Sequence, residues 1–211
     1  MKTLYLDNNA TTQVAPEVLE AMLPYLRDFY GNPSSAHTFG GQVARKIRAA
    51  REQAAALIGA MPEEIVFTSC GSESDNTAIR SALATETGKR HVVTSRVEHS
   101  AIKSLCAHLM KEGYRVTEIP VNSEGLLDMD RFEKSLIQDT AIVSLMWANN
   151  ETGVIFPVER AAEMARKRGI LFHTDAVQTV GKIPIDMKKN VVDMLSFSGH
   201  KLHAAKGVGV L

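Results

Sequence analysis

The sequence predicts an α/β fold, a mainly parallel sheet with helices on both faces. Apolar runs of strand length alternate along the chain with amphipathic stretches of helical length, which is typical of parallel sheets covered by helices. Three strand and helix units follow one another between residues 64 and 136. Because ligands of such sheets bind beyond the carboxyl ends of the strands, residues at those ends are the first candidates for a functional site.

The composition indicates a globular protein. Of the 211 residues, 45% are hydrophobic and 23% are charged, and 24 Lys and Arg balance 24 Asp and Glu. This balance excludes the basic field that drives sequence-independent nucleic-acid binding. No apolar run approaches the roughly 20 residues of a membrane helix, and Asp7 comes too early for a secretory leader. We therefore expect a soluble, cytoplasmic protein with neither nucleic-acid nor membrane partners.

The two cysteines, Cys70 and Cys106, are too few for a disulfide framework and have no metal-ligand spacing. We expect both to be small packed thiols, as free cysteines usually are. His200 and His203 are three residues apart, but no further ligand has suitable spacing, so no metal site is predicted. Other histidines, among them His173, are expected to be structural or surface residues.

Two helices are expected before the first strand. Residues 16–29 form the first, with Pro16 at its first position, and residues 31–35 form a loop. The second helix is longer and ends at Gly59. Its apolar residues recur at three- and four-residue steps and should face the core; they are Val43, Ile47, Ala50, Ala54 and Leu57.

The rest of the chain supplies the sheet and its covering helices. Strands are expected at residues 64–69, 91–95, 115–121, 141–147, 170–175 and 191–198, with helices after residue 69, from about residue 100, at 129–136 and at 158–168. Residues 207–211 are β-rich and have no turn or polar tail after them. A natural domain rarely ends in this way, and we expect a C-terminal part beyond Leu211.

The first candidate site is residues 67–74, where a strand passes through Gly71 and Ser72 into a helix. Unpaired N–H groups and the positive end of the helix dipole make such a turn suitable for a phosphate group. Ser72 as a simple N-cap is the alternative, and this segment alone favours it because such caps are common. A nucleotide-binding module is set aside, since neither G-x-G-x-x-G nor G-x-x-x-x-G-K-[ST] follows a strand.

Two further strand ends carry unusual polar residues. Asp175 ends an apolar strand, with Gln178 three residues on, and an Asp in such a place is usually a cap or turn residue. Ser198, His200 and Lys201 follow the next strand. Lys201 could simply reach solvent, or it could be held dry, where desolvation leaves a neutral amine able to attack a carbonyl group.

Each of these three segments has an ordinary structural explanation when it is taken alone. Taken together, they fit the needs of one cofactor better than they fit those separate explanations. Pyridoxal 5'-phosphate (PLP) requires an amine, an acid beside its pyridine nitrogen, a donor to its phenolate oxygen, a ring to stack on and donors to its phosphate. The sequence offers a candidate for each of these groups.

Six motifs resemble those of the cysteine desulfurases, and they follow one another in family order along the whole chain. They are residues 6–12 (LDNNATT), 31–35 (GNPSS), 97–99 (VEH), 147–153 (WANNETG), 173–178 (HTDAVQ) and 198–201 (SGHK). With so many separate motifs, chance similarity is negligible. The first and the fourth are closest to the nitrogen-fixation (NifS-like) branch of this family, which belongs to the class V aminotransferases.

The resemblance implies the fold of a fold-type I PLP-dependent transferase. Residues 1–13 would form an N-terminal arm, and residues 14–211 would form the PLP-binding large domain, truncated before the C-terminal small domain. The enzyme would be a homodimer whose sites lie near the subunit interface.

The resemblance also implies roles for individual residues. Lys201 and His99 would be catalytic: Lys201 would hold PLP as a Schiff base and later move the Cα proton, and His99 would stack on the ring. Asp175 would pair with the pyridine nitrogen, Gln178 with the phenolate oxygen, and Asn150 would lie near the cofactor and the substrate carboxylate. The remaining cofactor-binding residues, most of them for the phosphate, would be Gly71, Ser72, Ser198, Gly199 and His200.

Two positions depart from the family pattern. Ser72 stands where Thr is usual, which keeps the hydroxyl group. Ala205 replaces a common proline, so the loop after Lys201 would be less rigid. Neither change removes a chemical group that the implied roles need.

In this family, L-cysteine loses its sulfur to an enzyme cysteine, which leaves alanine and an enzyme persulfide for iron–sulfur cluster assembly on a scaffold protein. The nucleophilic cysteine, the arginine for the substrate carboxylate and the partner-subunit hydroxyl group for the phosphate would all lie beyond Leu211. We therefore expect no desulfurase turnover from this chain alone. We also expect exposed apolar surface where the small domain would cover the sheet.

Two alternatives stay open. The chain could belong to a related lyase that acts on selenocysteine or cysteine sulfinate and shares the cofactor site without the thiol nucleophile. It could also be a catalytically silent fragment that at most binds PLP or pairs with a full-length subunit.

Overall fold

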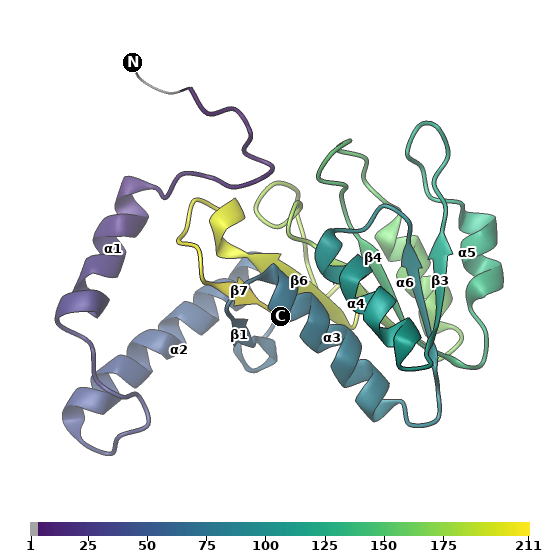
Figure 1. Cartoon of the computed structure of the whole chain (residues 1–211). Helices are drawn as coiled ribbons and strands as arrows, with labels where there is room; N and C mark the ends of the chain where they lie inside the picture. Colours follow the sequence, from purple (N-terminus) through teal and green to yellow (C-terminus); the bar gives the residue numbers. More distant parts are fainter. Residues whose placement is uncertain (1–3) are drawn as a thin grey trace.

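The computed structural model describes residues 4–211 and contains a seven-stranded sheet with helices on both faces (Figure 1). The strands lie in the order β1-β7-β6-β5-β4-β2-β3. Pairing is parallel from β6 through β5, β4 and β2 to β3, while β7 is antiparallel to both of its neighbours. The predicted α/β class with a mainly parallel sheet is confirmed.

The strands are β1 (Phe67–Thr68), β2 (His91–Ser95), β3 (Arg115–Ile119), β4 (Thr140–Met146), β5 (Leu171–Asp175), β6 (Met194–Ser198) and β7 (Gly209–Val210). The helices are α1 (Pro16–Arg27), α2 (Thr38–Ile58), α3 (Gly71–Thr85), α4 (Ser100–Lys111), α5 (Met129–Ser135) and α6 (Val158–Arg166), with 3₁₀ turns η1 (Pro62–Glu64) and η2 (Gly199–Lys201). α4 joins β2 to β3 and α6 joins β4 to β5, the crossover connections that parallel pairs need.

Two hydrophobic cores lie on opposite faces of the sheet. Because side chains alternate along a strand, Val92 of β2 and Ile142 of β4 pack with residues of α3 and α4, whereas Val93 and Val143 pack with residues of α5 and α6. Every residue of β2 and of β4 is buried, as expected for strands covered on both faces. This burial explains the apolar runs that predict these strands.

β2 spans the predicted residues, whereas the strands expected at residues 64–69 and 191–198 are shorter than predicted by at least three residues. The strand expected from Glu64 is confined to β1, because η1 turns the chain just before it. The strand expected from Val191 begins only at Met194, since the Val192 N–H donates to the Asn190 side chain rather than to a neighbouring strand. In both cases a local turn takes the backbone hydrogen bonds that the sheet would need.

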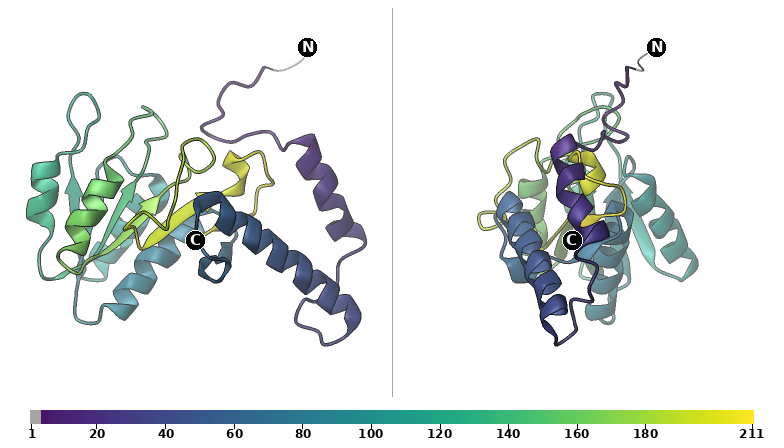
Figure 2. Two further views of the ribbon diagram at one scale, coloured as in Figure 1. Left: turned by 180° about the vertical axis from the view of Figure 1, so that it is seen from behind. Right: turned by 90° about the vertical axis from the view of Figure 1, so that its left-hand side faces the viewer.

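α1 and most of α2 project away from the sheet (Figure 1 and Figure 2). The predicted apolar stripe of α2 is therefore wrong in part: Ile47 is 39% and Leu57 is 47% exposed, while Ala55 and Ile58 are buried in the core. No residue of α1 is buried. Only the C-terminal end of α2 packs against the body of the protein, so tertiary packing and not periodicity decides which residues are covered.

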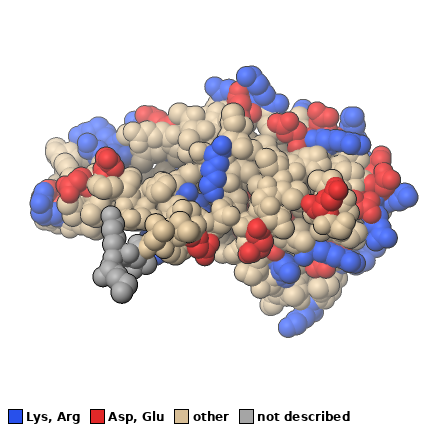
Figure 3. Space-filling view, turned by 90° about the horizontal axis from the view of Figure 1, so that it is seen from above, with Lys and Arg blue, Asp and Glu red and all other residues tan. Residues whose placement is uncertain are grey.

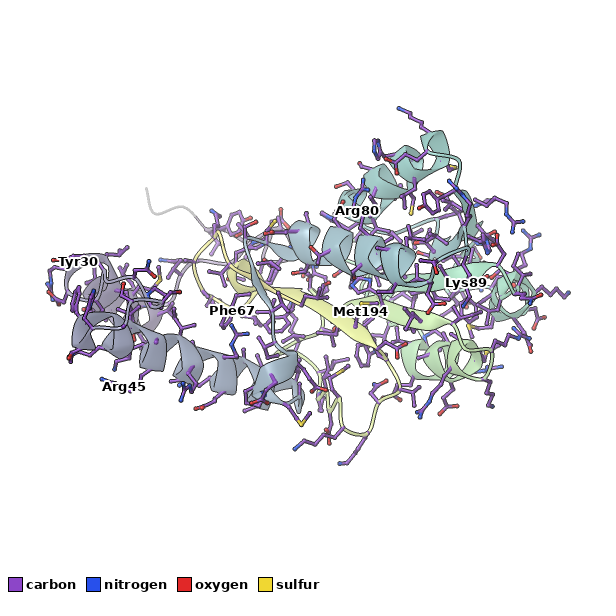
Figure 4. The ribbon with its side chains drawn as sticks, turned by 90° about the horizontal axis from the view of Figure 1, so that it is seen from below. Tyr30, Arg45, Phe67, Arg80, Lys89 and Met194 are labelled. Carbon is purple, nitrogen blue, oxygen red and sulfur yellow. The ribbon has the colours of Figure 1, made fainter. Side chains whose placement is uncertain are left out.

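The outer end of this projection is the connection between α1 and α2. The Tyr30 and Phe39 rings pack edge to face there, with centroids 5.2 Å apart. Tyr30 and Arg45 lie at one end of the molecule and Lys89 at the opposite end (Figure 4). Leu26 and Tyr30 are 75% and 77% exposed, so the projection carries an exposed apolar surface of the kind that usually meets another surface.

Residues 4–15 contain neither helix nor strand and run along the segment that carries Lys201. The Thr12 N–H donates to His200 O over 2.9 Å, and the Ala15 N–H donates to His203 O over 2.9 Å. These backbone hydrogen bonds tie the segment to the carboxyl edge of the sheet. We propose that residues 1–13 form an N-terminal arm. Residues 1–3 lie outside the described part of the chain.

The face in Figure 3 carries Lys and Arg interspersed with Asp and Glu. Within residues 4–211, no helix combines the length and the apolar character needed to cross a membrane. The same part of the chain brings no three His, Cys, Asp or Glu side chains together in an arrangement that could hold a metal ion.

Candidate active site

A cavity of about 440 Å³ opens at the carboxyl ends of the parallel strands. Its walls come from the segments that follow β1, β2, β4, β5 and β6, together with part of the N-terminal segment. Nine of the predicted site residues line it: Gly71, Ser72, His99, Asn150, Asp175, Gln178, Ser198, His200 and Lys201. The fold thus brings together residues from widely separated parts of the sequence.

The N-terminus of α3 forms one wall of the cavity. Cys70 occupies the N-cap position and its side chain makes no capping hydrogen bond, so the alternative in which Ser72 is a simple N-cap is wrong. The first N–H groups of a helix have no partner within the helix, which leaves those of Gly71 and Ser72 available to an anion. A Cβ at Gly71 would lie 2.9 Å from Val177 Cγ2, so a side chain there would have to displace a neighbour.

Asp175 ends β5, and its carboxyl group is buried at the cavity wall. Its Oδ1 accepts a hydrogen bond of 2.9 Å from the Val177 N–H, so the turn-forming role considered for Asp175 is present. Burial raises the pKa of Asp175, while the Val177 N–H, His99 and Lys201 act in the opposite direction. A cationic group bound beside Asp175 would favour its ionised form further.

Lys201 lies on η2, directly after β6, and is half-buried. Its Nζ donates hydrogen bonds to the backbone oxygen of Asn9 and, over 3.0 Å, to that of Ala10. Burial and the nearby Lys182 lower the pKa of Lys201, against the opposing effect of neighbouring carboxylates. A lysine with a lowered pKa loses its proton more readily, and the neutral amine is the form that attacks a carbonyl group.

The N-terminal segment supplies residues that sequence reasoning did not assign to the site. Asp7, Asn9 and Ala10 line the cavity. Asn9 connects two predicted residues, because its backbone oxygen accepts from Gln178 Nε2 over 2.9 Å and its Nδ2 donates to Asn150 O over 3.2 Å. The LDNNATT motif indicates the family, but it does not indicate what Asn9 does. Asn9 reaches the cavity only because the N-terminal segment folds back over η2.

Contacts at the Nδ1 atoms of His99 and His200 orient the two imidazole rings. His99 is the N-cap of α4, where Nδ1 accepts from the Ala101 N–H over 3.2 Å, and its ring is exposed in the cavity. Nδ1 of His200 lies 3.0 Å from the Thr11 hydroxyl oxygen. Both rings are therefore oriented by local contacts before any ligand binds.

Gly199, the tenth predicted site residue, is not among the residues that line the cavity. Its N–H donates to Val208 O over 3.0 Å, and a Cβ at this position would lie 3.3 Å from Ala204 Cβ. The Ser198 hydroxyl group donates to the same Val208 oxygen over 3.5 Å. Gly199 thus belongs to the turn behind the wall, where it shapes the start of η2.

Glu98 lies directly before His99 in the chain and is 4% exposed. Its carboxyl oxygens accept from the Ser95 hydroxyl group over 2.5 Å and from the Met146 N–H over 3.0 Å, so Glu98 joins the carboxyl ends of β2 and β4. Burial raises the pKa of Glu98 to about 8, although these hydrogen bonds lower it. The VEH motif contains Glu98, but only the structure shows that it braces the cavity wall.

We expect the protein to lose stability as the pH rises from about 6.5 to about 8. Folded Glu98 keeps a proton until about pH 8, whereas unfolded Glu98 with its ordinary pKa of 4.5 has lost it, so higher pH favours unfolding. His173 titrates with a folded pKa of about 3 and an ordinary value of 6.5, so its contribution changes only below this window. The expected loss is about 1 to 2 kcal/mol.

Urea unfolding at the two pH values measures this loss, and Glu98→Gln is the matched control. Glutamine keeps the shape of the side chain and cannot ionise, so the difference between the two pH values should shrink. An equal pH dependence in both proteins would show that Glu98 is not the group responsible.

Cys106 is fully buried, and burial raises the pKa of its thiol to about 12. Cys70 is only half-buried and lines the cavity, so the expectation of a packed thiol is met by Cys106 and not by Cys70.

We expect a thiol reagent to modify Cys70 at least about tenfold faster than Cys106, and PLP to slow the reaction. Mass spectrometry of labelled peptides measures both rates; rapid labelling that persists in Cys70→Ser would contradict this assignment.

Comparisons with known proteins agree with the sequence motifs and the fold. The family model described as aminotransferase class-V matches residues 4–211. A cysteine desulfurase of Nostoc sp. is 57% identical over 211 residues, all of this chain and 53% of that protein. The cysteine desulfurase NifS of Azotobacter vinelandii is 54% identical over 212 residues and is likewise matched over 53% of its length.

Solved structures show the same similarity. A structure described as a NifS-like protein has a TM-score of 0.95 at 43% identity, covering 99% of this chain and 58% of that one. One described as SspA in complex with cysteine has a TM-score of 0.95 at 39% identity, covering 99% and 60%. The chain spans about half the length of the curated relatives it matches. With a family model that covers nearly every residue, the chain belongs to the class V aminotransferase family.

Proposed function

We propose that the protein is a PLP-dependent cysteine desulfurase and that this chain carries its cofactor site. The main support is that three chemically distinct groups meet in one cavity: the Lys201 amine, the buried Asp175 carboxyl group and the N-terminus of α3. The class V aminotransferase family is PLP-dependent, and these are groups that PLP requires.

The donor set fits the parts of the cofactor. A phosphate group suits the N–H groups of Gly71 and Ser72, where glycine leaves room for a close approach. The aldehyde suits the half-buried amine of Lys201, and the pyridine nitrogen suits the acid at Asp175. Bound PLP supplies an electron-withdrawing ring that stabilises negative charge at the Cα atom of an amino acid.

The residues of this chain would divide the work around the ring. Lys201 would hold the cofactor through Nζ and, once released, would accept the proton from the substrate Cα. Asp175 would keep the pyridine nitrogen protonated, and the His99 ring would cover one face and exclude water. Gln178 would donate to the phenolate oxygen, and Asn150 would contact the substrate carboxylate.

The substrate, partners and remaining groups are proposed from the resemblance. One similar structure is described in complex with cysteine, and we propose L-cysteine as the substrate and alanine as a product. The thiol that takes the sulfur and the arginine for the substrate carboxylate would come from residues that this chain does not contain. We further propose a cytoplasmic homodimer that supplies sulfur to an iron–sulfur scaffold protein, in the nitrogen-fixation branch of the family.

A chimera tests the proposed activity. Residues 1–211 would replace the matching part of the Nostoc cysteine desulfurase, which is 57% identical over this range. We expect the chimera to convert L-cysteine to alanine with release of sulfide, Lys201→Ala to abolish the conversion, and the 211-residue chain alone to show no turnover.

The same assay separates the alternatives. A folded chimera that contains PLP and acts on L-selenocysteine or L-cysteine sulfinate, but not on L-cysteine, would favour a related lyase. A folded chimera that binds PLP and is inactive on all three substrates would favour a catalytically silent chain. Either result would contradict the proposed desulfurase activity.

A further inference from the structure

A row of buried polar side chains lies beneath the cavity, and the proposed function gives it no role. Asp75 on α3, Ser144 on β4, His173 on β5 and Ser196 on β6 are each at most 1% exposed. A helix packed on a sheet normally meets it through apolar residues, because a buried polar group costs free energy unless it is hydrogen-bonded. The polar row at this interface therefore requires a physical reason.

Hydrogen bonds link three members of the row. His173 Nδ1 lies 2.9 Å from Ser144 Oγ, and its Nε2 lies 2.7 Å from Ser196 Oγ. Burial lowers the pKa of His173 to about 3, so the ring is neutral at neutral pH and one hydroxyl group can pair with each nitrogen. Asp75 Oδ1 lies 3.6 Å from His173 Nε2 and has no hydrogen-bond partner among the described residues.

The row ends against Asp175. Side chains alternate along β5, so His173 and Asp175 point to the same face of the sheet. Ser196 is the register partner of Asp175 on β6, and Asp75 and Asp175 both line the cavity. The carboxyl groups of Asp75 and Asp175 are therefore buried in the same wall of the cavity, where ionising both would cost free energy.

Burial raises the pKa of Asp175, but three neighbours of its carboxyl group oppose this shift. It accepts a hydrogen bond from the Val177 N–H over 2.9 Å. His99 and Lys201 also lie close enough to lower its pKa, against the effect of burial.

The surroundings of Asp75 are different. Burial and the nearby Asp175 raise its pKa well above the ordinary value, Glu98 and Cys70 act in the same direction, and only the Ser196 hydroxyl group opposes them. No lysine or arginine is among the groups that shift it. If only one of the two carboxyl groups ionises, these surroundings favour a protonated Asp75 and a charged Asp175.

We propose that Asp75 is a positioning residue that keeps its proton in the wall beneath the cavity, so that Asp175 carries the charge facing the pyridine nitrogen of the cofactor. As a neutral acid, Asp75 can donate a hydrogen bond to the row of His173 and Ser196, which holds β5 and β6 in register under the cavity. The orienting role rests on the proposed function. The protonation itself does not require the cofactor to be bound.

Infrared spectroscopy of the cofactor-free protein measures this protonation, because a neutral carboxylic acid has its own carbonyl stretching band. At neutral pH we expect Asp75→Asn to lose such a band relative to the unsubstituted protein, with the circular dichroism spectrum unchanged. Glu98→Gln removes a further buried acid whose pKa is raised. Asp175 is a third such acid, so a band that is present in Glu98→Gln and absent from the double variant Glu98→Gln/Asp75→Asn belongs to Asp75, whereas a band that persists unchanged in the double variant would place the proton on Asp175 and overturn the proposal. A Glu98→Gln spectrum without any neutral-acid band would overturn the proposal, even if Asp75→Asn did not fold.

Binding of PLP separates the orienting role from a purely structural one. Asp75→Asn keeps the shape and the neutrality of the acid, so the dissociation constant of PLP should change by less than about threefold, and the pH midpoint of the visible PLP band should not move. Asp75→Leu, similar in size but unable to form a hydrogen bond, should weaken binding about tenfold or more and shift that midpoint.

Two results would overturn the orienting role. A midpoint shift of about one pH unit or more in Asp75→Asn would mean that Asp75 is charged in the loaded protein, and binding by Asp75→Leu equal to that of the unsubstituted protein would mean that the row does not orient Asp175. If the unsubstituted protein bound no PLP, the proposed function would fail, while the infrared spectra would still decide the protonation of Asp75.

Discussion

Replacing Lys201 by alanine is expected to abolish the visible absorption band that PLP forms with the unsubstituted protein. The band requires a covalent bond between the cofactor aldehyde and a primary amine, and Lys201 lines the cavity. Lys201→Ala should still bind PLP through Asp175 and the N-terminus of α3, but gel filtration should then remove the cofactor. Absorption spectra before and after gel filtration measure both effects.

Lys182 provides the matched control for this substitution. Its Nζ donates to Gln178 Oε1 over 2.9 Å, and burial lowers its pKa as it does that of Lys201. Lys182→Ala should therefore keep the visible band. Loss of the band in Lys182→Ala and its survival in Lys201→Ala would exchange the roles of the two lysines.

Replacing Asp175 by alanine is expected to weaken PLP binding by about 10- to 100-fold, the effect of losing one hydrogen bond to a charged group. The acid lies in a buried part of the wall, where water cannot replace it as a partner of the pyridine nitrogen. Asp175→Asn should have an intermediate effect, since it keeps the size of the side chain and can still accept from the Val177 N–H. Titration of the visible band with PLP measures the dissociation constants.

Asp7→Ala controls for the net charge of the cavity. Asp7 also lines the cavity, but it is exposed, so water would screen its charge and its removal should change binding by less than about threefold. Equal losses in Asp7→Ala and Asp175→Ala would indicate that the total charge matters and that Asp175 has no specific partner in the cofactor.

The sheet and most of the cavity wall could be predicted from the sequence because their signals are local. β2 and β4 are buried on both faces, so each is an apolar run of strand length. Asp175 and Lys201 follow such runs directly, and ligands of α/β sheets meet those strand ends. Gly71 could be placed in the wall for the same reason, although the N-cap proved to be Cys70 rather than Ser72.

Features that depend on packing between distant segments could not be predicted. Ile47 fits the apolar period of α2, yet it is exposed because only the C-terminal end of the helix, beyond that position, packs against the body of the protein. Asn9 lies in the cavity only because the N-terminal segment folds back over η2. Asp75 follows Ser74 and precedes Asn76, so it resembles a solvated helix residue until α3 is seen to pack over β5 and β6.

Reduction with borohydride after incubation with PLP, followed by peptide mass spectrometry, tests most directly whether Lys201 holds the cofactor. We expect a pyridoxyl group on the peptide that contains Lys201 and none on the peptide that contains Lys182, with labelling suppressed by excess inorganic phosphate that competes at the N-terminus of α3. A folded protein that carried the label on another lysine, or that carried no label, would contradict the cofactor site proposed for this chain.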